Sequence, residues 1–259
     1  GASPDVLCVT RPEWKGIIMD WSPVFISLKT ATASIIITFF LGAAMAELVF
    51  CIKNKKLKMI LDGLFTLPLV LPPTVAGFFL LYIFGIRRPV GKFLVDYFSM
   101  KIAFSWEATV LAAVLISFPL MYRAARGAFE QVNPDLLSAG RTLGMAEWNI
   151  FWKIQFPVAR PGVVSGAVLA FARGLGEFGA TAMIAGNISG KTRTLPLAVY
   201  AAVASGDTRE ASGYVAVLVG ISFLVVIMMN YFSMKTPGSD RAGRRGRRGK
   251  RAAGFTENK

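Results

Sequence analysis

The sequence contains no histidine and only two cysteines, and its 15 acidic residues are outnumbered by 29 basic ones. Without histidine, both imidazole zinc ligands and histidine-based acid–base catalysis are excluded. Cys8 precedes the first long apolar run and Cys51 lies at its far end, so we expect no disulfide between them. We therefore expect no metal site, no cofactor and no catalytic residues in this chain.

Polar segments are also scarce. Hydrophobic residues make up 54% of the 259 residues, and the mean hydropathy is +0.53, which is too apolar for an ordinary soluble domain. The formal net charge of +14 could indicate nucleic-acid binding, but nine of the 29 basic residues lie from Lys235 to the end. We therefore expect a polytopic protein of the lipid bilayer with no nucleic-acid partner, in which residues 235–259 form a disordered basic tail.

Five apolar runs are long enough, or nearly long enough, to cross a bilayer, which takes roughly 20 residues. They are residues 23–52, 63–86, 108–122, 161–189 and 211–234. The second run is uncharged but contains Pro68, Pro72 and Pro73, so it should be kinked or broken. The sequence predicts an all-α transmembrane bundle of five spans, or six if the proline-broken run counts as two.

The distribution of Lys and Arg among the loops predicts the orientation of this bundle. If residues 53–58 face the cytosol, eighteen basic residues lie on that side and nine on the other. Cytosolic loops of membrane proteins carry the excess of Lys and Arg. We therefore expect residues 1–21 to be an extracytoplasmic segment without a signal peptide, and residues 131–157 and the basic tail to be cytosolic.

Residues 131–157 are too charged and too broken to cross a bilayer, although long apolar runs flank them. Asn133 can cap a short helix that begins with Pro134 and Asp135. Gly144 supplies the backbone freedom to end that helix. A segment of this kind should lie on the membrane surface and be accessible from water.

A second short helix should begin at Glu147 and be closed by Pro157, since proline removes a backbone donor. Four apolar residues recur along it at spacings of three and four, so one face is apolar and partly aromatic. They are Trp148, Phe151, Trp152 and Ile154. The two helices together predict an amphipathic helix–turn–helix at the interface, and a plain loop packed against the bundle is the alternative.

The spacing in this segment resembles the EAA loop of ABC-importer permeases: Glu-Ala-Ala, three residues, Gly, nine residues, Ile-x-Leu-Pro. Four residues keep the family spacing, namely Ala139, Gly144, Ile154 and Pro157. Three depart from it: Ser138 stands for Glu, Gly140 for Ala and Phe156 for Leu. The resemblance implies that these seven residues form a coupling loop that docks into a groove of a separate ATPase subunit, with one ion-pairing carboxylate fewer at the contact.

Two ionisable residues lie inside the fourth predicted span. Arg173 and Glu177 are four residues apart, which places them on one helix face. Charged groups at that depth are costly and tend to face the bundle interior. Two interpretations stay open: a structural intrahelical ion pair that cancels its own charge, and a direct contact with the transported substrate.

Residues 185–192 match a relaxed phosphate-loop pattern, in which Ala185 is followed after four residues by Gly190, Lys191 and Thr192. Phosphate binding by such a loop needs a strand that leads into it and a helix that leaves it, so that backbone N–H groups converge. A predicted membrane span leads into this segment instead. We therefore expect no nucleotide site here and no ATP hydrolysis by this chain.

Further segments resemble, more specifically, the permease subunit of molybdate and tungstate ABC importers. These are residues 67–73, 171–181, 185–187 and 194–200, and the likeness extends from about Ser22 to Met234, a transmembrane permease domain. It implies a non-catalytic homodimer in the cell membrane, two ATPase subunits, an extracytoplasmic oxyanion-binding protein and an alternating-access mechanism. The residues we expect along the translocation pathway are Pro72, Thr74, Arg173, Glu177 and Thr181.

Three alternatives remain at this stage. Sulfate or thiosulfate permeases share the segment 176–180 and are the closest competitor. A passive anion channel would need no ATPase-docking loop. An intramembrane enzyme would need reactive groups that converge at depth, for which Arg173 and Glu177 are the only candidates. The helix–turn–helix spacing argues against the last two.

Overall fold

The computed structural model describes residues 20–52 and 54–234, so the predicted basic tail and all but two residues of the predicted N-terminal segment lie outside the described residues. Helices dominate the described part, which contains no β-strand. They are α1 (Ser22–Cys51), α2 (Lys55–Val70), α3 (Pro73–Phe84), α4 (Pro89–Phe98), α5 (Trp106–Glu130), α6 (Pro134–Thr142), α7 (Glu147–Ile150), the π-helix η1 (Phe151–Gln155), α8 (Phe156–Leu175), α9 (Gly179–Ile184), α10 (Leu195–Ala204) and α11 (Thr208–Met234). The predicted all-α class is confirmed.

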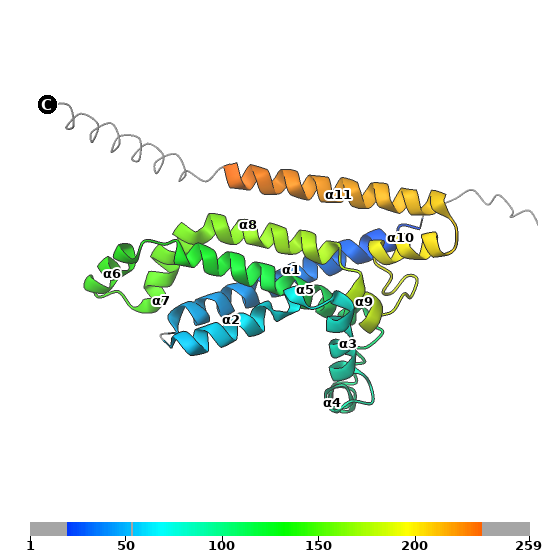
Figure 1. The fold of residues 1–259 in the computed structure, drawn as a ribbon, viewed down its shortest axis with the longest axis horizontal. Coiled ribbons are helices and arrows are strands. Elements are labelled where there is room, and N and C mark those ends of the chain that lie inside the picture. Colours follow the sequence, from blue (N-terminus) through cyan, green and yellow to red (C-terminus); the bar gives the residue numbers. More distant parts are fainter. Residues whose placement is uncertain (1–19, 53, 235–259) are drawn as a thin grey trace, which may run out of the picture.

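Helices α1, α5 and α8 form the centre of the bundle (Figure 1). α1 and α5 run in the same direction, because hydrogen bonds join residues 79 positions apart at two levels. The hydroxyls of Thr30 and Thr109 lie 3.0 Å apart, and those of Thr38 and Ser117 lie 3.1 Å apart. Each pair satisfies two polar groups inside an apolar bundle, where an unpaired hydroxyl would be costly.

Small residues allow α8 to approach α5 closely. Gly162 lies against Ala128 and Gly166 against Ala124, so the two helices run in opposite directions. A Cβ built on Gly162 would lie only 2.8 Å from the Cβ of Ala128. Helices pack at such short distances where one of the two side chains is missing.

The proline-containing second run is broken, as its sequence predicted. α2 and α3 meet at Leu71 and Pro72 with a bend of 110°, and Figure 1 shows α3 and α4 projecting away from the long axis of the bundle. Pro72 can cap α3 but cannot continue α2, because it lacks a backbone N–H. Counting the bent pair as one, up to five spans fit the described helices by length and composition, and a sixth is not among them.

The fourth span was predicted at residues 161–189, and both of these boundaries are wrong. The helical run begins at Glu147 and ends at Leu175, so Pro157 does not close a second short helix. The chain instead forms a π turn immediately before the proline, in which the Phe156 N–H bonds the Phe151 carbonyl five residues back. This wider turn relieves the clash between the proline ring and the preceding carbonyls, and the helix continues.

The third predicted span and two short helices also differ from the sequence prediction. The third predicted span, residues 108–122, is part of a longer helix, α5, because Arg123, Arg126 and Glu130 are still helical at its C-terminal end. The short helices α9 and α10 were not predicted, since each is too short to give a clear apolar period. The first and fifth predicted spans are confirmed as α1 and α11.

Candidate functional site

The predicted helix–turn–helix begins with α6, whose ends are set by local chemistry. The Asn133 Oδ1 accepts a 2.9 Å hydrogen bond from the Asp135 backbone N–H, which caps the helix, and Pro134 occupies its first turn. Gly144 has φ +73°, a left-handed conformation that reverses the chain after the helix. The predicted caps and turn are confirmed.

An ion pair that the sequence analysis missed closes this turn. Nε and Nη2 of Arg141 lie 2.6 and 3.1 Å from the two carboxylate oxygens of Glu147. The pairing with Glu147 raises the pKa of Arg141, and both side chains stay exposed. Their spacing of six residues across a glycine turn was the available signal, since it brings the end of one helix to the start of the next.

The inner face of the helix–turn–helix belongs to the same apolar core as the bundle. Leu137 and Ile150 are buried together with Tyr122, Phe129 and Val163 of the long helices. Because these side chains share one close-packed core, the helix–turn–helix is packed directly against α5 and α8.

The seven predicted docking residues do not share one face. Gly140 is buried, where a Cβ would lie 3.0 Å from Cδ1 of Ile154. Ile154 and Phe156 are half-buried. The exposed members are Ser138, Ala139, Gly144 and Pro157. The surface open to a partner is therefore formed by the outer side of α6 and the turn, and the last apolar positions of the pattern fix that surface to the bundle.

Two details define this outer surface. Leu143, at the turn, is 81% exposed and presents an apolar side chain to solvent. The hydroxyl of Ser138 donates a 2.6 Å hydrogen bond to the Pro134 carbonyl of its own helix. At the position where the family pattern has a carboxylate, this chain therefore has a neutral group already used within α6.

The aromatic face of the second helix borders a groove against α1. The groove has a volume of about 480 Å³ and its lining is mainly apolar. Its aromatic side chains are Phe39, Phe40, Trp148, Phe151, Trp152 and Phe156. The predicted amphipathic face is thus confirmed. Trp148 and Trp152 are exposed at its edge, as is typical of side chains at a membrane interface.

Arg173 and Glu177 do form an ion pair, with Nη1 of Arg173 2.8 Å from Oε2 of Glu177. They do not lie on one helix as predicted, because α8 ends at Leu175 and Glu177 follows the break. The other carboxylate oxygen of Glu177 accepts a 2.8 Å bond from the Ala180 N–H at the start of α9. Glu177 is 2% exposed and Arg173 is about one-third exposed, so only the cation faces open space.

The remaining predicted pathway residues gather where α3 meets α9. Pro72 caps α3, and the Thr74 backbone lies against Gly179, whose Cβ would be 3.2 Å from the Thr74 nitrogen. Thr74 is exposed and Thr181 is buried. The break between α8 and α9 therefore brings Glu177 and Thr181 into one region with the α2–α3 bend.

The segment that matches a phosphate loop does not form one. α9 leads into it, and the Lys191, Thr192 and Arg193 N–H groups all donate to the carbonyl of Ile188. These N–H groups already donate hydrogen bonds within the loop, so they cannot converge on a phosphate. Within residues 20–52 and 54–234, moreover, no three His, Cys, Asp or Glu side chains are grouped as metal ligands.

One protein family matches most of the chain. The family described as "binding-protein-dependent transport system inner membrane component" matches residues 38–235. A putative molybdenum transport system permease protein of Bacillus subtilis is 40% identical over 213 residues, covering 81% of this chain and 92% of that protein. The molybdenum transport system permease protein ModB of Escherichia coli is 38% identical over 240 residues, covering 92% and 100%.

Solved structures show the same fold. An inward-facing structure of the MetNI methionine ABC transporter superposes with a TM-score of 0.65 at 18% identity and covers 82% of this chain and 93% of that chain. A bacterial ABC transporter involved in the import of the acidic polysaccharide alginate gives 0.66 at 12% identity, with coverage of 87% and 82%. At these identities the likeness establishes the architecture alone.

Proposed function

Because this chain belongs to the family of binding-protein-dependent transport system inner membrane components, we propose that it is the permease subunit of an importer of molybdate or tungstate. The observation that carries the proposal is its 38% identity to the molybdenum permease of Escherichia coli over that protein's entire length. The chain provides the membrane pathway, and ATP is hydrolysed by a separate subunit.

The outer surface of α6 and the turn is the contact for that ATPase subunit. It is exposed, it carries Ala139 and Gly144 at the family spacing, and its inner side is built into the core of the bundle. Closure of two ATPase subunits on ATP would displace the coupling loop, residues 131–157. The shared core would then move α5 and α8, and the pathway would change its side of opening.

The charge distribution and the family support an orientation and an assembly for this permease. The N-terminus lies outside and the C-terminus in the cytosol, because the coupling loop must face the ATPase and eighteen basic residues lie on its side. Two copies of the chain enclose the pathway, and a binding protein delivers the oxyanion from outside. Residues 22–234 form the permease domain.

Arg173 is the residue best placed to meet the oxyanion. It engages Glu177 through one hydrogen bond, although a guanidinium carries five N–H donors. Planar donors of this kind suit oxyanions. Because Glu177 is buried and fixed by the Ala180 N–H, it holds the guanidinium at the α8–α9 break while part of that group stays exposed.

Reconstitution tests the proposal. In proteoliposomes that contain this chain, its ATPase and its binding protein, molybdate or tungstate should stimulate ATP hydrolysis and accumulate inside, whereas sulfate at the same concentration should not. Uptake of sulfate with indifference to molybdate would assign the chain to sulfate import. Conductance without ATP would indicate a passive channel.

A matched pair of variants tests the role of Arg173. Arg173→Gln should reduce molybdate uptake strongly, whereas Arg209→Gln, which removes an exposed charge from the first turn of α11, should not. Equal uptake by both variants would leave the Arg173–Glu177 pair as a purely structural feature.

A further inference from the structure

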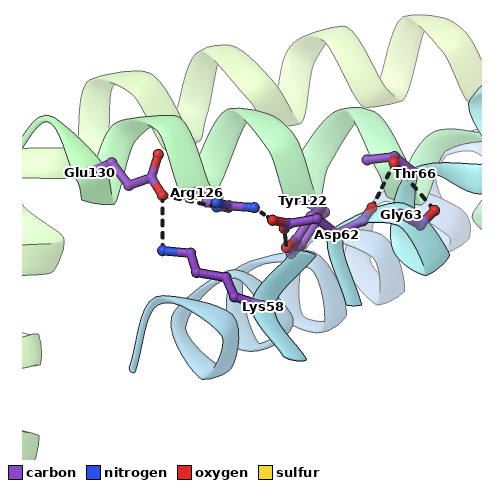
Figure 2. Close-up of polar contacts among 7 residues, drawn as sticks. All are labelled: Lys58, Asp62, Gly63, Thr66, Tyr122, Arg126 and Glu130. Atoms are coloured by element: carbon purple, nitrogen blue, oxygen red, sulfur yellow. Dashed lines mark hydrogen bonds and ion pairs between the residues drawn. The ribbon is translucent and has the colours of Figure 1, made fainter. Parts of the chain in front are cut away.

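A chain of charged side chains joins α2 to α5 (Figure 2). Arg126 pairs with Asp62 and also with Glu130, whose Oε1 lies 3.0 Å from the Arg126 Nε. Lys58 reaches the same Glu130 oxygen at 3.3 Å. The Tyr122 hydroxyl donates to the Asp62 carboxylate. We name Lys58, Asp62, Tyr122, Arg126 and Glu130 the α2–α5 latch.

Within this chain, the latch provides the ion pairs and hydrogen bonds that join α2 to α5. None of its residues is buried, so burial of apolar side chains contributes little to its attachment. Its apolar contacts with the core come from Leu61 and from Phe65, whose ring packs edge-on against Phe118 and Tyr122 at centroid distances of 5.7 and 5.2 Å. One end of α2 follows α1 through a short loop, and the other ends at the 110° bend.

The bend itself is anchored on its far side. A Cβ on Gly77 of α3 would lie 2.7 Å from the Ala180 backbone, so α3 is packed tightly on α9. α2 therefore joins a fixed element at Pro72 and is attached to the bundle through the latch and through the packing of Leu61 and Phe65. Ion pairs of this kind can break and re-form when one element moves past another, as interface salt bridges do in known switching proteins.

The latch also lies at the joint that leads to the coupling loop. Glu130 is the last residue of α5, and Asn133, three residues later, caps α6. A displacement of α6 must tilt this end of α5 and strain the contacts of Glu130 and Arg126 first. A cavity of about 420 Å³ beside the latch, lined by Gly63 and Gly127 among others, leaves space for α2 to shift.

We propose that the α2–α5 latch holds α2 against the bundle in the conformation described here and opens when the coupling loop moves. Arg126, which lines the same cavity, is already engaged by two carboxylates and is not free to bind an anion there. The latch involves only α2 and α5, and its link to ATP hydrolysis rests on the proposed transport function.

A distance measurement tests the latch directly. The full chain, with Cys8→Ser and Cys51→Ser, carries spin labels at Leu64→Cys on α2 and Val158→Cys on α8, both exposed positions, and is reconstituted with its ATPase subunit. Asp62→Asn keeps an acceptor for Tyr122 but removes the ion pair, and Arg126→Gln removes the cation. Each should shift or broaden the label distance by roughly 2–5 Å, the scale of helix shifts in switching proteins.

Two controls make the result decisive. Combining Asp62→Asn with Arg126→Gln should change the distance no more than the larger single change, because both changes break the same Asp62–Arg126 contact between the helices and the other partner of Arg126, Glu130, lies on α5 itself. Lys56→Gln removes one positive charge, as Arg126→Gln does, but from an exposed position of α2, and should leave the distance unchanged. Unchanged distances in both single variants, or an equal change in Lys56→Gln, would overturn the latch.

A second readout separates the latch from the proposed function. In the complete importer, Asp62→Asn should raise ATP hydrolysis in the absence of loaded binding protein. If Arg126→Gln fails to fold, Lys58→Gln breaks the outermost contact and should produce a smaller distance change. A shifted distance together with no ATP hydrolysis in any complex, wild type included, would refute the transport function and support the latch.

Discussion

Gln155 donates a 2.8 Å hydrogen bond from Nε2 to Oε2 of Glu47, and so joins two residues that are 108 positions apart. Gln155 lies in the π turn that follows α7 and is 4% exposed, whereas Glu47 lies near the end of α1. The bond fixes the coupling loop to a helix outside its own hairpin. It also satisfies a buried amide at the point where the chain departs from regular α geometry.

The first prediction follows from this bond. Gln155→Met keeps the size of the side chain but deprives the Glu47 carboxylate of a donor, and should destabilise the protein by about 1–3 kcal/mol. The measurement is thermal unfolding in detergent. Asn149→Met is the matched control, because the Asn149 side chain is exposed, and its melting temperature should be unchanged. Equal melting temperatures for the two variants would contradict the anchoring role of Gln155.

Gly144 should be required for coupling as well as for local structure. Its φ is +73°, and that of Gly206, between α10 and α11, is +81°; neither Cβ would meet an atom within 4 Å. Gly144→Ala and Gly206→Ala should each cost about 1–2 kcal/mol of backbone strain. Substrate-stimulated ATP hydrolysis should fall in Gly144→Ala and vanish in Gly144→Leu, while Gly206→Ala retains it. Wild-type coupling in Gly144→Leu would show that the turn is not at the contact.

Glu177 should contribute more to stability than a member of an exposed ion pair. Glu177→Ala leaves the Ala180 N–H and Arg173 without their acceptor, and should cost about 2–3 kcal/mol, below the full value for a buried pair because Arg173 is partly exposed. Arg141→Gln is the control for an exposed ion pair and should scarcely change the melting temperature. A larger loss in Arg141→Gln than in Glu177→Ala would reverse this ranking.

Orientation can be measured with two matched alanines. Ala204, at the end of α10, and Ala146, between α6 and α7, are both exposed. In a chain without its native cysteines, an impermeant thiol reagent applied to intact spheroplasts should label Ala204→Cys and not Ala146→Cys. The reverse pattern would place the coupling loop outside the cell and exclude contact with a cytosolic ATPase.

The purified chain by itself should hydrolyse no ATP. The loop at residues 185–192 uses its N–H groups internally, with three of them bonded to the Ile188 carbonyl. Lys191→Ala should therefore leave ATP hydrolysis by the complete importer unchanged in a phosphate-release assay. Hydrolysis by the isolated chain that disappears in Lys191→Ala would mean that this loop binds nucleotide.

Local chemistry was sufficient for several features of this protein. Apolar runs determined the class and most of the spans, because a bilayer demands uninterrupted hydrophobic length. Asn133, Pro134 and Gly144 determined where α6 begins and ends, because caps and left-handed turns depend on the residue itself. The spacing from Ala139 to Pro157 indicated the family, and the matched family covers that segment.

Other features depended on neighbours that are distant in the sequence. Pro157 was expected to end a helix, yet a π turn and the core contacts of Ile150 let the helix continue into α8. Glu177 was expected inside a helix, but the chain breaks at Gly176 and its carboxylate caps α9. The α2–α5 latch joins residues 60 or more positions apart. Periodicity describes one helix at a time, so only tertiary packing could decide where proline is tolerated and which charges meet.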